Sequence, residues 1–276
     1  MKDRIDQRFA ALRAEGRAAF VAYVMAGDPD AAAALSILKG LPAAGADLIE
    51  LGFPFSDPMA EGPPIQRAAQ RALAAGMTLK GTLDLVRAFR QGDRTTPLIL
   101  MGYLNPLVTW GFDAFAQAAG EAGVDGLIVV DCPPEEADPL ADALDRAGIA
   151  LIRLATPTTD DKRLPVVVRR TAGFVYYVSV AGVTGVKEAD AAAVAPAVER
   201  VRKASGLPVA VGFGIKTPER AAAIAQVADA VVVGSALVDE VAEAVERNED
   251  VTARVLSKVE ALAKAVRFAR QGQQAV

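Results

Sequence analysis

Short apolar runs rich in β-branched residues alternate along the chain with alanine-rich stretches that favour helix. The runs lack a strict alternation of apolar and polar residues, which is typical of parallel strands covered on both faces. We predict strands at Phe20–Met25, Leu48–Leu51, Leu98–Met101, Gly126–Val130, Ala150–Leu154, Phe174–Ser179, Pro208–Val211 and Ala230–Val233.

Helical segments separate these strands, so the chain is a series of βα units. Eight such units in roughly 250 residues predict a (β/α)8 TIM barrel, and a doubly wound open sheet is the alternative. No linker or change of composition divides the sequence. We therefore expect residues 1–276 to form a single TIM-barrel domain.

An extra helix is expected before the first strand, where Ile5, Phe9 and Leu12 share one face of the segment Lys2–Glu15. This amphipathic helix is predicted to plug the bottom of the barrel. The segment Val251–Ala269 is expected to be a packing helix of the same kind.

Two βα units are longer than the others, and both carry glycine and acidic residues. One contains the stretch from Glu50 to Gln66, and the other contains the sequence G-V-T-G-V-K-E-A-D. Barrel enzymes build their active sites from the loops that follow the strands, so these extra residues indicate function. A neutral loop insertion is the alternative for either one alone.

Composition excludes several classes of protein and narrows the chemistry. The net charge of −4 argues against a nucleic-acid or anionic-membrane surface, and the single Cys132 excludes an internal disulfide. The charged N-terminus lacks a signal-peptide core and no apolar run is long enough to span a membrane, so we expect a cytoplasmic protein. Because the chain contains no histidine, proton transfer near neutral pH falls to carboxylates, Lys, Tyr or Cys.

Glu50 and Glu61 are the candidate acid–base groups. Glu50 ends an apolar strand, where partial desolvation would raise its pKa and let it deliver a proton. Glu61 lies on a proline-rich loop. We expect this loop to be longer and more mobile than the strand end at Glu50, and therefore suited to closing over a substrate. The alternatives are a salt-bridged glutamate at a strand end for Glu50 and a solvated loop charge for Glu61.

Glycine-rich turns follow the last three predicted strands, at Gly182–Gly185, Gly212–Gly214 and Gly234–Ser235. In barrels these loops, with the N-terminus of a short helix, commonly bind phosphate. Turn geometry explains any one of them alone, but three at the same rim favour a phosphate site. Few basic residues accompany these turns, and Lys216 is the nearest, so we expect the phosphate to be recognised mainly by the backbone.

Aromatic and leucine side chains at or near the strand ends suggest an apolar cavity beside the phosphate. A flat hydrophobic substrate with a phosphorylated tail would fit it, although each aromatic alone is more often a core residue. The residues are Tyr23, Phe53, Tyr103, Tyr176, Phe213, Leu100 and Leu127.

These features together resemble the tryptophan synthase alpha subunit family, over nearly the whole chain and in the expected order. The matching segments are I-E-L-G-F-P-F-S-D-P at 49–58, G-P-P-I-Q at 62–66, M-G-Y-L-N-P at 101–106, G-V-D-G-L-I-V-V-D at 123–131, Y-Y-V-S at 176–179, G-V-T-G at 182–185, V-G-F-G-I at 211–215 and V-G-S-A at 233–236.

The resemblance implies a lyase that cleaves indole-3-glycerol phosphate to indole and D-glyceraldehyde 3-phosphate by a retro-aldol reaction in tryptophan biosynthesis. It implies no metal and no organic cofactor in this chain. It also implies a partner, a beta subunit that carries pyridoxal phosphate, in an α2β2 heterotetramer.

The resemblance also implies roles for individual residues. Glu61 stands where the family usually has aspartate, and Val180 stands where some members have arginine. The catalytic residues would be Glu50, Glu61 and Tyr176; the substrate contacts Phe213, Thr184, Tyr103 and Leu100; the phosphate-binding residues Gly185, Gly214, Gly234 and Ser235; and the partner-facing residues Pro54, Asp57 and Asn105.

Two other functions remain open at this point. One is a different phosphate-binding barrel, such as a phosphosugar isomerase or epimerase, which would need a different acid–base set. The other is an idle alpha subunit that only binds and activates its partner, which the glutamate at position 61 allows and an intact Glu50 opposes. Cys132 is expected to serve as small apolar packing because no basic partner for it is evident.

Overall fold

The computed structural model describes residues 3–179, 191–212 and 214–271 and contains a closed barrel of parallel strands in the order β1-β2-β3-β4-β5-β6-β7-β8. Strand β1 pairs with both β2 and β8, which closes the sheet. The strands are β1 (Ala19–Met25), β2 (Leu48–Gly52), β3 (Leu98–Gly102), β4 (Gly126–Val129), β5 (Ala150–Ala155), β6 (Val175–Val178), β7 (Val209–Gly212) and β8 (Ala230–Val233).

The predicted TIM barrel is confirmed, and each observed strand begins and ends within one residue of its predicted bounds. The sequence predicts the strand bounds closely because the strands are buried on both faces. Strand β1, for example, is buried at every position. Such strands leave continuous apolar runs in the sequence.

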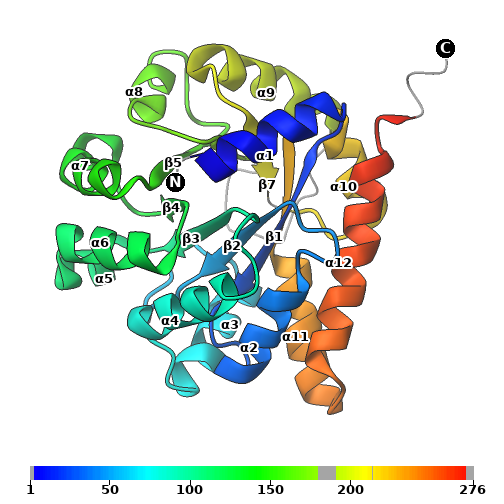
Figure 1. Ribbon diagram of the computed structural model, residues 1–276. Helices are drawn as coiled ribbons and strands as arrows, with labels where there is room; N and C mark the ends of the chain where they lie inside the picture. Colours follow the sequence, from blue (N-terminus) through cyan, green and yellow to red (C-terminus); the bar gives the residue numbers. More distant parts are fainter. Residues whose placement is uncertain (1–2, 180–190, 213, 272–276) are drawn as a thin grey trace.

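Helices form a ring around the strands (Figure 1). The long interval between β2 and β3 holds two helices, α3 and α4, which accounts for its length. The helices are α1 (Asp3–Ala14), α2 (Ala31–Gly40), α3 (Pro63–Ala74), α4 (Leu79–Arg90), α5 (Leu104–Trp110), α6 (Phe112–Ala122), the 3₁₀ turn η1 (Pro134–Glu136), α7 (Asp138–Ala147), α8 (Leu164–Val168), α9 (Ala191–Ser205), α10 (Pro218–Ala225), α11 (Ser235–Arg247) and α12 (Val251–Phe268).

Helix α1 lies across the amino-terminal end of the barrel, as the sequence predicts (Figure 1). Ile5 is fully buried, and its side chain lies against Gly126 at the start of β4 and Gly173 just before β6. The ring of Phe9 contacts that of Phe174, with 5.8 Å between the centroids. The apolar stripe of α1 therefore seals the bottom of the barrel, and the other end is left for the site.

A buried ion-pair cluster fixes the same end of the barrel. Asp125 is fully buried and accepts hydrogen bonds from Arg4 at 2.6 Å, from Arg90 at 2.7 Å and from the backbone N–H of Leu98 at 2.9 Å. The cluster ties α1, α4 and β3 to the segment before β4. No helix within the described part of the chain is long and apolar enough to cross a bilayer.

Candidate active site

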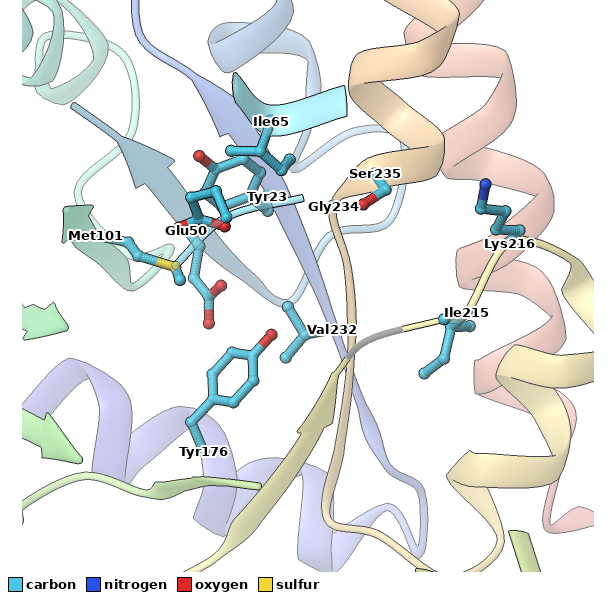
Figure 2. A pocket seen from close by; sticks show the side chains of 12 residues that line it. Tyr23, Glu50, Ile65, Met101, Tyr176, Ile215, Lys216, Val232, Gly234 and Ser235 are labelled. Carbon is cyan, nitrogen blue, oxygen red and sulfur yellow. The ribbon is translucent and has the colours of Figure 1, made fainter. Parts of the chain in front are cut away.

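A cavity opens at the carboxyl ends of the strands and is lined from both sides of the barrel (Figure 2). In a barrel this end is where the loops after the strands gather and where catalysis takes place. Its lining residues are Tyr23, Glu50, Glu61, Ile65, Met101, Tyr176, Gly214, Ile215, Lys216, Val232, Gly234 and Ser235.

Glu50 projects into this cavity from β2, and Figure 2 shows its carboxyl group and the hydroxyl of Tyr176 directed toward the same space. Its side chain is fully buried, and neither carboxyl oxygen has a hydrogen-bond partner among the described residues. Burial raises the pKa of Glu50 to about 8, and the nearby carboxyl of Glu61 adds to the rise. At neutral pH Glu50 therefore holds a proton that it can donate.

Glu61 is buried, so the alternative of a solvated loop charge does not hold. The side-chain amide of Gln66 donates a hydrogen bond to the backbone carbonyl of Glu61 at 2.9 Å. One residue earlier, the N–H of Ala60 donates to the phenol oxygen of Tyr103, also at 2.9 Å. Burial raises the pKa of Glu61 to about 7, so this carboxyl changes charge near neutral pH.

Tyr176 lies on β6 and is buried, and its ring occupies the space beside Gly212 of β7. A Cβ atom on Gly212 would overlap with the phenol oxygen of Tyr176, so the small residue on β7 makes room for the ring. Burial, with smaller contributions from Glu50 and Glu61, raises the pKa of Tyr176 well above its usual value. The phenol is therefore neutral and can donate a hydrogen bond toward the cavity.

Tyr23 repeats this arrangement on the other side of Glu50. Tyr23 of β1 and Glu50 of β2 are register partners, and both line the cavity. Gly52 leaves room for the phenol oxygen of Tyr23, because an added Cβ atom there would overlap with it. Burial and the two carboxyls raise the pKa of Tyr23 as well.

The predicted phosphate residues that the structure describes lie together at one side of the cavity. Gly214, with a φ of 74°, follows β7, and Gly234 and Ser235 follow β8. Ser235 is the first residue of α11, so the free N–H groups and positive end of this helix face the same space. The backbone there is built to receive an anion.

Several predicted site residues lie elsewhere. Leu100 does not line the cavity, whereas Met101 does. Because neighbouring residues of a strand point to opposite faces, Leu100 faces the helix layer, and its predicted place in the cavity is taken by Met101. Tyr103 does not line the cavity. Its phenol oxygen accepts a hydrogen bond from the backbone N–H of Ala60, and its ring stacks on Phe55 with 5.2 Å between the centroids.

Three more predicted residues, Phe213, Thr184 and Gly185, lie outside the described residues. Cys132 is buried, as expected for packing, but the sequence did not reveal that Arg153 lies beside its thiol. Burial outweighs this neighbour and raises the thiol pKa, so Cys132 stays protonated.

The predicted partner-facing residues differ in their exposure. Asp57 and Asn105 are exposed, whereas Pro54 is buried in this chain. Two large apolar side chains are also exposed on these segments: Met59, with 85% of its surface accessible, and Val108, with 56%. The loop that carries Glu61 and helix α5 therefore each present an apolar side chain to solvent beside a polar one.

Four cavity-lining residues were not predicted from the sequence: Ile65, Met101, Ile215 and Val232. Lys216 was named only as the basic residue nearest the glycine turns, not as part of the cavity. Alternation along each strand from a known inward residue would have found Met101 and Val232. Nothing local identifies Ile65 or Lys216. Among the residues that the structure describes, no group of three or more His, Cys, Asp or Glu side chains could hold a metal ion.

Comparisons with known proteins agree with this geometry. The family model described as tryptophan synthase alpha chain matches residues 9–267. The tryptophan synthase alpha chain of Phenylobacterium zucineum is 84% identical over 275 residues, covering 100% of this chain and 99% of that protein. The Caulobacter vibrioides alpha chain is 78% identical over 271 residues, covering 98% of each.

Solved structures show the same likeness. The tryptophan synthase subunit alpha of Legionella pneumophila superposes with a TM-score of 0.89 at 43% identity, covering 95% of this chain and 98% of that one. A chain of Mycobacterium tuberculosis tryptophan synthase gives 0.86 at 37% identity, covering 96% and 98%. This chain belongs to the tryptophan synthase alpha chain family.

Proposed function

We propose that Glu50 and Glu61 form the acid–base pair of this chain and that Tyr176 contacts the reacting end of the substrate. Membership of the family makes the chain a lyase that cleaves indole-3-glycerol phosphate to indole and D-glyceraldehyde 3-phosphate. The observation that carries the residue assignment is the cavity itself. Two buried carboxyls with raised pKa values line it together with the free N-terminus of α11.

The cleavage needs a proton on the indole ring and the loss of one from the side chain. In the proposed reaction Glu50 first donates its proton to the ring carbon that bears the glycerol chain. The hydroxyl on the adjoining chain carbon then gives up its proton to the Glu50 carboxylate, and its electron pair forms the aldehyde carbonyl. The carbon–carbon bond breaks, and its electrons return to the ring, which leaves as neutral indole.

The second carboxyl is proposed to act on the other side of the ring. A carboxylate at Glu61 would accept a hydrogen bond from the indole N–H. This contact would stabilise the positive charge that ring protonation creates. Its burial supports this role because an ion pair is stronger away from water. Tyr176, neutral and buried, would donate its hydroxyl toward the reacting chain.

The phosphate is proposed to bind at Gly214, Gly234 and Ser235, and Gly185 is proposed to join them. Apolar side chains of the cavity, among them Ile65, Met101 and Val232, would enclose the indole. The substrate would thus lie across the barrel mouth, with its charged end at α11 and its ring near Glu50.

An alpha chain of this family implies a beta-subunit partner. We infer an α2β2 heterotetramer in the cytoplasm, docked through the rim that carries Asp57 and Asn105. Pyridoxal phosphate is expected only in the beta subunit, and the alpha reaction is expected to need neither metal nor organic cofactor.

The test is indole release from indole-3-glycerol phosphate by the purified chain, alone and with a beta subunit, after treatment with a chelator. We expect slow release by the chain alone and faster release by the complex. A folded chain that binds the beta subunit but releases no indole in either state would contradict the proposed catalytic assignment and leave an idle binding subunit.

A further inference from the structure

Lys216 lies at the phosphate side of the cavity, where the sequence suggested recognition mainly by the backbone. It follows Gly214 and Ile215 after β7, and Figure 2 shows it on the same side of the cavity as Gly234 and Ser235. Among the described residues that line the cavity, it is the cation. The carboxyl groups there are those of Glu50 and Glu61.

The ammonium group of Lys216 is only loosely neutralised. Its Nζ lies 3.8 Å from Oδ2 of Asp239, which is longer than a hydrogen bond, and the side chain is 51% exposed. The same aspartate is shared, because Arg67 of α3 lies 3.9 Å from its other oxygen. One carboxylate thus faces two cations, and this small cluster carries an excess of positive charge.

Asp239 is placed to compete with a bound phosphate. It lies on α11 four residues after Ser235, which is about one helical turn beyond the free N-terminus of that helix. A lysine side chain has several rotatable bonds, so a short swing can move its ammonium group between two acceptors on the same helix end.

We propose that Lys216 is a phosphate-binding side chain and that Asp239 holds its ammonium group until a phosphate ester displaces the carboxylate. This inference rests on the proposed phosphate site. A phosphate ester carries nearly two negative charges at neutral pH, whereas a helix N-terminus offers about half of one positive charge. Lys216 supplies a full charge where the glycine turns supply only N–H dipoles.

The direct test is calorimetric titration of sn-glycerol 3-phosphate, which carries the same charged end as the substrate. We expect Lys216→Met to weaken binding roughly 5- to 20-fold, the scale of a charge-assisted contact at a half-exposed site. Lys216→Arg should recover most of it. Lys203→Met is the matched control, because Lys203, in the last turn of α9, is also an exposed lysine 3.6 Å from a carboxylate, that of Glu199 one turn earlier.

The Asp239→Asn variant tests whether Asp239 gives up the ammonium group of Lys216 to the phosphate or only positions it. Removing the competing carboxylate should tighten binding about 2- to 3-fold, whereas a carboxylate that merely positions Lys216 would give weaker binding when neutralised. Equal affinities for wild type, Lys216→Met and Lys203→Met would overturn the proposal. Weaker binding by Asp239→Asn would overturn the exchange with Asp239.

Steady-state kinetics gives a second measurement. A group that holds the phosphate equally in the ground and transition states changes KM and leaves kcat unchanged, so Lys216→Met should raise KM at near-normal kcat. If the wild type releases no indole, the proposed function fails while calorimetry still tests Lys216. If the wild type binds no sn-glycerol 3-phosphate, the phosphate site and this proposal both fail.

Discussion

The phenol oxygen of Tyr103 accepts a hydrogen bond from the backbone N–H of Ala60 at 2.9 Å, one residue before Glu61. Tyr103 follows β3 and is buried, so a rigid strand end holds the loop that carries the second carboxyl. We expect Tyr103→Phe to keep the stacking on Phe55 but to lower kcat about 3- to 10-fold, the scale of one hydrogen bond.

Tyr177→Phe is the control for that variant, because it removes the same atom from the neighbouring residue of β6 that faces away from Tyr176. Steady-state indole release measures both. Equal rates for the two variants and the wild type would mean that the Tyr103 contact does not position Glu61.

Glu50→Gln is expected to keep the fold and the binding of sn-glycerol 3-phosphate but to lose cleavage by at least ~10²-fold. The amide has the shape of the carboxyl but cannot donate and accept the reacting proton. Glu260→Gln, at an exposed position of α12, makes the same chemical change away from the site. Near-normal indole release by a folded Glu50→Gln protein would remove Glu50 from the mechanism.

The pH dependence of kcat/KM should be bell-shaped. The proposed mechanism needs Glu61 ionised and Glu50 protonated, and burial raises the pKa of Glu61 to about 7 and that of Glu50 to about 8. The rate should therefore rise as pH passes about 7 and fall as it passes about 8, with both limbs belonging to the coupled pair.

Glu61→Gln tests which group gives which limb. It should remove the acidic limb, and it should move the alkaline limb to lower pH, because the Glu61 charge contributes to the raised pKa of Glu50. An alkaline limb that stays in place would show that the two carboxyls do not interact.

Asp57→Ala should weaken activation by the beta subunit more than it weakens basal cleavage. Asp57 is exposed on the loop that leads to Glu61, and Met59, on the same loop, exposes 85% of its surface. A partner docked there would restrain the loop and stabilise the reactive arrangement. Titrating beta subunit into the cleavage assay measures this, with Asp84→Ala on α4 as the control. Full activation of the Asp57 variant at saturating partner would place the coupling elsewhere.

Much of the fold follows from local sequence. Strands such as β1 are buried at every position, so their apolar runs marked them within one residue. The stripe of Ile5, Phe9 and Leu12 marked α1 in the same way. Glu50 could be singled out because a carboxylate at the end of an apolar strand has few structural uses, and the structure gives it no hydrogen-bond partner among the described residues.

The number and order of the strands, the closing helix and the family could be predicted without coordinates, because burial on both faces and the local motifs involve neighbouring residues. Strand alternation needs one known inward residue on each strand, and the fold supplies that reference and brings distant groups together. The strand alternation that turns Met101 inward and Leu100 outward depends on register between strands. The burial of Glu61, the support from Tyr103 and the approach of Lys216 to Asp239 arise where separate loops converge, and no local pattern records that convergence.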